Sequence, residues 1–230
     1  MEKYETNVTS RLIVARYILV YVLLAHKNLK DAQSEVEKFG VMAEKSQLPL
    51  AKAYYHLTDG MVKLLKHELG SALELGQRAK EALTLVHYHS GQIQVIKFIL
   101  QIHLHLYLST KEEGTKIVIQ GLLKELEDLT EREGHKYAYI EALMIRGLLR
   151  KSEFDLPGAN EQFELAETLA LECGHQVLAR SARTEASQLQ EQYSILQRHM
   201  TAFPVEFEQT RIQELISYIE GAKQQVKDSD

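Results

Sequence analysis

The stretch Leu156–Ala166, LPGANEQFELA, places small or apolar residues at steps of three, four and three positions. The stretch Leu69–Ala79, LGSALELGQRA, shows the same steps. Residues spaced in this way lie along one face of an α-helix, and the alanine at the second place lets another helix approach closely. Gly147 and Gly60 precede these alanines by twelve residues, at the matching place of an earlier helix. The two copies therefore predict a repeated pair of closely packed helices.

Further copies of the pattern extend the repeat along the chain. One consists of Leu29, Ala32, Val36 and Phe39, and a weaker one of Gly114, Ile117, Gly121 and Lys124. With these copies the repeat is about 40 to 45 residues long, as in helical solenoids. Turn-forming segments separate the helical stretches, at residues 26–28, 46–49, 67–70, 87–91, 109–114, 134, 152–158, 174 and 201–204. Short connections favour antiparallel neighbours, so the sequence predicts an all-α chain of stacked helical hairpins.

Leu156–Ala166 with Gly147, and Leu69–Ala79 with Gly60, resemble the tetratricopeptide repeat family. The helix–turn–helix unit of that family carries a small residue on its first helix. Its second helix carries a small residue, then an aromatic or small residue, and an alanine. The resemblance spans about residues 8–174 as four hairpins. It implies a right-handed superhelical stack of antiparallel hairpins, an α-solenoid whose first helices line a concave surface that binds other proteins.

The chain departs from the standard unit of that family in three ways. Its repeats are longer than the family's 34 residues. Val20 and His105 replace the small first-helix residue in two copies, and no proline closes the units. The sequence is therefore similar to the divergent, long-repeat members of the family. Other solenoids with repeats of about 40 residues are the alternative.

The last part of the chain has a different pattern. Spacings of four and three run through residues 182–200 and, after Pro204, through residues 212–226. Such spacings are typical of a coiled-coil seam. We therefore expect four hairpins in residues 1–174 and a C-terminal capping hairpin in residues 175–230. A homodimer through residues 176–227 is the alternative.

The composition indicates the cellular compartment of the chain and limits the classes of partner that it could bind. The single cysteine cannot form an internal disulfide, and a net charge of −5 argues against general affinity for nucleic acid. The longest apolar run, Leu12–Ala25, contains Arg16 and is shorter than the 18 or so apolar residues of a membrane span. We expect this run to form a helix buried on most sides, with membrane contact as the alternative. The chain is expected to be cytoplasmic and without a membrane span.

The ten histidines raise the question of a metal site. His87 and His89, like His103 and His105, are two residues apart, which places the members of each pair on different faces of a helix. The run 172–175, ECGH, is accounted for by a helix end. The sequence contains no HExxH motif, phosphate-binding loop or nucleophile elbow. We therefore expect no metal, no cofactor and no catalytic residues.

Charge is divided between the two helices of the predicted hairpins. The first helices, at about 8–25, 48–66, 91–108 and 135–151, carry ten Lys or Arg residues against only Asp59 and Glu141. The second helix at 156–173 carries four glutamates and no Lys or Arg. If the first helices line a concave surface, that groove is basic and its outer side is acidic. A basic groove attracts and orients an acidic ligand.

The sequence thus favours a non-catalytic scaffold or adaptor that binds an acidic protein or peptide segment. Tyrosines in the first helices would add contact area. The predicted groove residues are Arg16, Lys52, Tyr55, Lys63, Lys97, Tyr139, Arg146 and Arg150. An alternative is that these charges only solvate the helices. Others are a structural subunit assembled through Leu12–Ala25 and residues 176–227, and a sensor of peptides or small ligands.

Overall fold

The computed structural model describes residues 2–46 and 48–202, and these residues form α-helices and no strand. The helices are α1 (Glu2–Ala25), α2 (Leu29–Ser46), α3 (Pro49–Leu65), α4 (Leu69–Leu85), α5 (His89–Thr110), α6 (Glu113–Glu133), α7 (Lys136–Ser152), α8 (Leu156–Glu172) and α9 (Gln176–Ala202). The all-α prediction is confirmed. The predicted turns from residue 26 to residue 174 each include, or lie within, the connection between two of these helices, although some extend into the following helix, as 87–91 extends into α5.

Six of the turns end the preceding helix with the same backbone motif. Between α8 and α9, the Gly174 N–H donates to the Leu171 carbonyl (3.0 Å) and the His175 N–H donates to the Ala170 carbonyl (2.8 Å). This pair of bonds around one left-handed residue is a Schellman motif. The left-handed residues of the six turns are Lys27, His67, His87, Gly134, Phe154 and Gly174.

The repeated sequence pattern forms the contacts between helices. Ala32, Ala72 and Ala159, the small residues at the second place, are fully buried. Phe39, Ala79, Phe163 and Ala166 are also fully buried. The first three copies of the pattern are therefore confirmed as core positions, except that the first leucine of each copy is only half-buried.

The fourth copy was placed wrongly. Gly114, Ile117, Gly121 and Lys124 are all exposed on α6. The buried residues with the same steps are Ile119, Leu122, Leu126 and Leu129. The reason is length: α5 and α6 have 22 and 21 residues, whereas α3 and α4 have 17 each. Because the third hairpin is longer, its core contacts on α6 begin after an additional first turn and a half.

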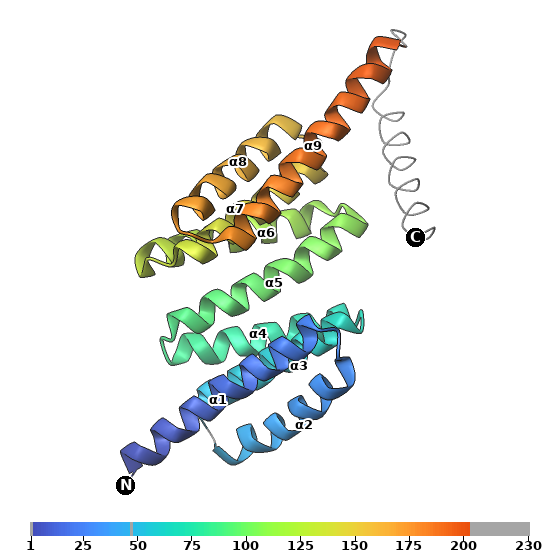
Figure 1. The fold of residues 1–230 in the computed structure, drawn as a ribbon. Coiled ribbons are helices and arrows are strands. Elements are labelled where there is room, and N and C mark those ends of the chain that lie inside the picture. The colour runs from blue at the N-terminus through green and yellow to red at the C-terminus, as the bar shows by residue number, and fades with distance from the viewer. Residues whose placement is uncertain (1, 47, 203–230) are drawn as a thin grey trace. The chain divides into compact units, whose positions relative to one another are not determined.

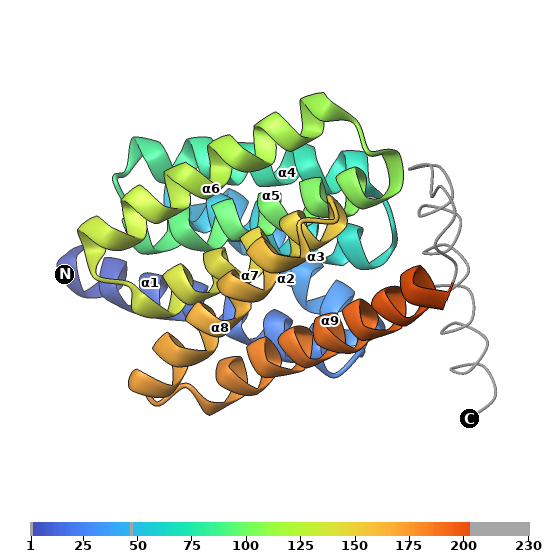
Figure 2. The same cartoon turned by 90° about the horizontal axis from the view of Figure 1, so that it is seen from above.

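Consecutive helices pack against one another, as predicted (Figure 1). We call α1, α3, α5 and α7 the leading helices and α2, α4, α6 and α8 the trailing helices. Besides these consecutive contacts, α1 contacts α3, α3 contacts α5, and α5 contacts α7. In the described part of the chain, no two trailing helices have backbones in contact. The leading helices thus form a continuous row, whereas each trailing helix touches its sequence neighbours. Figure 2 shows the same helices from above, after a turn of 90°.

The contacts divide the chain into two units, Met1–Arg183 and Thr184–Asp230. The first unit contains α1 to α8 and the beginning of α9, where Ala179 and Ala182 join a core cluster with α7 and α8. In the second unit, Ala186 and Leu189 are buried on the remainder of α9. The predicted last helix of the capping hairpin, Ile212 to Val226, lies outside the described residues.

The expectation that Leu12–Ala25 is buried on most sides is wrong. Within this run only Ile13 and Val20 are buried, and the opposite side of α1 is exposed. α1 is packed through one face against α2 and α3, and no other helix of the described residues contacts it by its backbone. None of the helices described is long and apolar enough to cross a membrane.

Candidate functional site

Aromatic side chains from several leading helices meet in one place. The ring centroids of Tyr17 on α1 and Tyr54 on α3 lie 5.0 Å apart. Tyr54 lies 6.4 Å from Tyr88, which directly precedes α5, and Tyr21 lies 6.4 Å from Tyr17 on the same helix. Tilted and edge-on ring pairs at these distances are favourable. We call these four residues, together with Tyr137 of α7, the tyrosine cluster.

Tyr137 is the residue of α7 that belongs to the cluster, because its phenol is within electrostatic range of Tyr21. The Nζ atom of Lys97 on α5 lies 5.3 Å from the centroid of the Tyr137 ring, which is a cation–π distance. Lys97 also forms an ion pair with Glu141 of α7, and both side chains are largely buried. The Lys97–Glu141 pair thus ties α5 to α7 beside Tyr137.

Burial and neighbouring groups raise the pKa values of the tyrosines. Burial, followed by the nearby Tyr21 and Glu141 groups, raises the pKa of Tyr17 to about 12. Burial also raises the pKa of Tyr54, and the neighbouring Tyr88 phenol adds to this effect. The influence of Glu141 on Tyr17 joins α7 to α1, although these helices have no backbone contact in the described residues. Tyr17 on α1 thus lies within electrostatic range of Glu141 on α7.

The cluster is anchored in the core but partly open to solvent. Tyr54 is only 6 % exposed, whereas Tyr21 and Tyr137 are 56 % and 44 % exposed. Tyrosine offers a flat apolar ring and a hydroxyl group, and its ordering costs little entropy because it has few rotatable bonds. A partly exposed set of tyrosines held by buried neighbours is a surface suited to binding another protein.

Besides Lys97, which pairs with Glu141, four of the predicted groove cations are paired with carboxylates of the chain itself. The pairs are Arg16–Glu35 (2.8 Å), Lys63–Glu68 (2.8 Å), Arg150–Asp155 (3.4 Å) and Arg146–Glu127. A carboxylate this close offsets the positive charge, so these four residues contribute little to the field around the leading helices. The pairs of Arg16 and Arg146 join a leading helix to a trailing helix. The division of charge seen in the sequence therefore also serves helix pairing.

The other four predicted residues lie in different places. Only Lys97 lies beside the tyrosine cluster. Tyr55 packs against α2 instead, where its ring covers Gly40. Successive residues of a helix point about 100° apart, so Tyr54 and Tyr55 cannot both face the cluster. Lys52 on α3 and Tyr139 on α7 are exposed.

Tyr17, Tyr54 and Tyr137 were among the tyrosines expected to line the groove from the first helices, but three other residues of this site were missed from the sequence. Tyr21 lies one turn after Tyr17, and the spacing of four residues would have revealed it. Glu141 carried a signal as one of the two acidic residues in the predicted first helices. Tyr88 lies in a turn, where helical periodicity says nothing about the direction of a side chain.

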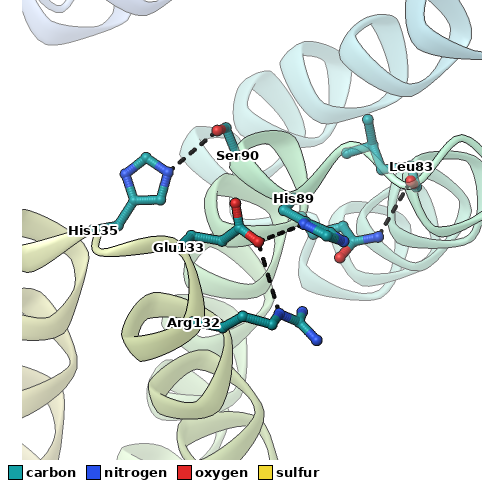
Figure 3. A network of polar contacts seen from close by, with 7 residues as sticks. Leu83, His89, Ser90, Arg132, Glu133 and His135 are labelled. Atoms are coloured by element: carbon teal, nitrogen blue, oxygen red, sulfur yellow. Dashed lines mark hydrogen bonds and ion pairs between the residues drawn. The ribbon is translucent and has the colours of Figure 1, made fainter.

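A second polar cluster joins the α4–α5 and α6–α7 turns (Figure 3). The Nδ1 atom of His89 lies 2.6 Å from a carboxylate oxygen of Glu133, and the Ser90 hydroxyl lies 3.3 Å from Nε2 of His135. A serine nucleophile needs a histidine that is itself oriented by a third group. No carboxylate of the described residues bonds to His135, so we assign these contacts to bracing the two turns.

A pocket of about 380 Å³ lies beside this polar cluster. It is lined by Gln92, Gly121, Lys124, Glu125, Asp128, Leu129 and Arg132. Sites for small molecules are mostly apolar with a few polar groups, whereas this lining is mostly charged. Glu125 is moreover engaged by Lys80 at 2.6 Å. Over the part of the chain described, no three His, Cys, Asp or Glu side chains are placed to hold a metal ion. The tyrosine cluster is therefore the stronger candidate.

Comparison with known proteins does not place the chain in a family. The resemblance to the tetratricopeptide repeat therefore rests on the residues quoted above and on the packing of the hairpins. No model of a known protein family matches the sequence, and a comparison with characterised proteins gives no match.

Proposed function

We propose that this chain is a non-catalytic scaffold that binds a segment of a partner protein along its leading helices, with the tyrosine cluster at the centre of the contact. The supporting observation is the ring contact between Tyr17 and Tyr54 from two leading helices, with Tyr137 of a third leading helix within electrostatic range of Tyr21. Aromatic side chains in well-packed surroundings supply much of the binding energy of protein interfaces. The exposed rings of Tyr21 and Tyr137 are the points where a partner would gain most contact.

We infer that the row of leading helices curves inward, as in a tetratricopeptide array. Leading helices touch one another, whereas trailing helices do not, so the trailing helices are spread further apart. In addition, Glu141 on α7 influences the phenol of Tyr17 on α1. Both features are expected of a stack that bends toward its leading side. A superhelical α-solenoid and membership of the tetratricopeptide family belong to this proposal.

We further propose that the partner segment is acidic. Lys52 on α3 and Lys136 on α7 are exposed, and no carboxylate among the described side chains pairs with either. Arg16, Lys63 and Arg150 do not support this part of the proposal, because carboxylates offset their charge. A cytoplasmic location completes the proposal, and it is supported by the single cysteine.

A displayed library of random linear peptides, selected against the full-length chain, provides the probe for this function. The affinity of a selected peptide is then measured by fluorescence anisotropy. We expect the double variant Tyr21→Ala/Tyr137→Ala to bind at least about tenfold more weakly, since an interface anchor contributes more than ~1 kcal/mol. The matched control is Leu85→Ala, because Leu85 is 79 % exposed on a trailing helix. Lys52→Glu tests the preference for acidic peptides.

The outcomes separate the site from the charge preference. Unchanged affinity in a double variant that is folded by circular dichroism would contradict the site. Selected peptides without an excess of acidic residues would contradict only the acidic partner. Charge reversal at Lys97 or Arg146 is unsuitable as a test of binding. Each change would remove the partner of a carboxylate on a neighbouring helix and lower stability.

A further inference from the structure

The outward side of α1 is apolar between residues 11 and 25. Its large apolar side chains are 38–56 % exposed, namely Leu12, Val14, Ile18, Leu19, Tyr21 and Val22. The charged residues between positions 11 and 25 are Arg11 and Arg16, and Arg16 is held by Glu35 of α2. Soluble proteins seldom leave such a surface uncovered.

The exposed residues of α1 include a regular seam. Arg11, Ala15, Ile18, Val22 and Ala25 follow at steps of four, three, four and three residues, and all five are exposed. We call these five residues the α1 seam. Leu12 and Leu19 flank it on one side, and Val14 and Tyr21 flank it on the other. Steps of this kind align residues for packing against another helix, and the two alanines permit close approach.

The area of this face suits a pair of copies. The exposed fractions of the six large side chains correspond to roughly 500 Å² of apolar surface, at the upper end of the ~300–600 Å² of the largest patch on a typical monomer. Two such faces in contact would bury about 1,000 Å², which reaches the lower limit of a specific interface.

We propose that the α1 seam binds the α1 seam of a second copy of this chain, antiparallel and around a two-fold axis at Ile18. In this arrangement Ile18 of one copy meets Ile18 of the other, and Ala15 lies near Val22. Arg11 of each copy lies at the C-terminal end of the other α1, where the helix dipole favours a positive charge. A self-complementary apolar surface without acidic residues fits such a symmetric contact. The proposal does not depend on the peptide-binding function.

The test changes the residue on the axis in the full-length chain. The oligomeric mass of the wild type, Ile18→Glu and Ile18→Lys is measured by sedimentation equilibrium over a range of concentrations. We expect the wild type to be a dimer and each variant to be at least about tenfold weaker in association, because like charges meet on the axis. An equimolar mixture of the two variants should recover the dimer, because Glu then faces Lys. Leu85→Glu is the matched control and should remain dimeric.

Three results would overturn the proposal. They are a wild type that is monomeric at every concentration, a dimer that persists in both charged variants, and a mixture of these variants that stays monomeric. If the charged variants lose their helical circular dichroism signal, the double variant Leu12→Gln/Leu19→Gln is tested instead. This milder double variant should weaken the dimer, and an unchanged dimer would again contradict the proposal. Tyr21 belongs to the tyrosine cluster and also flanks the α1 seam, whereas Ile18 lies outside the cluster. Failure here is distinct from failure of peptide binding, because the Ile18 variants leave Tyr21 and Tyr137 unchanged.

Discussion

Glycines on the helices make room for aromatic rings. A Cβ atom at Gly60 or Gly76 would lie 2.9 and 3.3 Å from the ring of Phe98, which reaches both α3 and α4 from α5. At Gly147 on α7, a Cβ atom would lie 2.5 Å from the ring of Phe163 on α8. Here the sequence was informative, because a small residue and an aromatic residue at fixed places predicted a close approach of two helices.

The variant Gly147→Ala tests this close approach. We expect it to lower the free energy of unfolding by about 1–3 kcal/mol, since the added methyl group overlaps a fully buried ring. The matched control is Gly121→Ala on α6, where nothing lies within 4 Å of the added atom. That change should raise stability by about 0.5–1 kcal/mol through helix propensity. Urea denaturation measures both, and equal effects of the two variants would refute the packing explanation.

The raised pKa of Tyr17 predicts a loss of stability in alkali. The phenol has an ordinary pKa of 10.0 in the unfolded chain and a pKa of about 12 in the folded chain. Its contribution to stability is complete below pH 10 and is lost as the pH rises from 10 to 12, because only the unfolded chain then releases the proton. Urea denaturation at several alkaline pH values should show a shallower decline for Tyr17→Phe than for the wild type. Parallel declines would contradict the assignment.

At the scale of elements, the sequence predicted turns better than it predicted exposure. Glycine at 134 and 174 indicated helix ends, and both residues adopt the left-handed conformation there. The register of α6 was missed, because periodicity marks a helix face but not the turn at which packing begins. The exposure of α1 was missed because an apolar run predicts a buried helix only if other helices cover it on several sides. Which neighbour exists depends on tertiary contacts that a local pattern does not contain.

The repeated Schellman motif allows a paired prediction at two turns. Lys27 has φ 57°, a conformation that disfavours residues with a Cβ atom, and its side chain is exposed. Lys27→Gly should therefore raise stability by about 0.5–1 kcal/mol. Gly174 has φ 75°, so Gly174→Ala should lower stability by about 1 kcal/mol. Thermal unfolding monitored by circular dichroism measures both changes. A shift in the same direction for both would contradict the role assigned to the motif.

At the scale of the molecule, the stacking of consecutive helices could be predicted from the sequence, but most of the site could not. Lys97 lies beside the tyrosine cluster, where residues of the leading helices were expected to lie close together. Arg16 and Arg146 are on the expected helices, yet they face trailing helices and carboxylates. A count of charges per helix does not give the direction of each side chain. The partners that offset a charge are far away in sequence, as with Lys97 and Glu141.

The position of α5 within the first unit predicts that its backbone amides exchange hydrogen slowly. This helix contacts α3, α4, α6 and α7, and ten of its residues are buried, against five in α2. Local unfolding that exposes α5 must therefore break contacts with four other helices. Hydrogen exchange followed by mass spectrometry should find the slowest amides in α5 and faster exchange in α2. Faster exchange in α5 than in α2 would contradict this hierarchy.

The separation of the trailing helices bears on how such a chain changes over time. A helix that touches only its neighbours in sequence can grow without colliding with distant parts of the protein. In the third hairpin, α6 is four residues longer than α4, and most residues of its first turn and a half are exposed. We therefore expect insertions to be tolerated best in the trailing helices, so that homologous chains would differ in length mainly there.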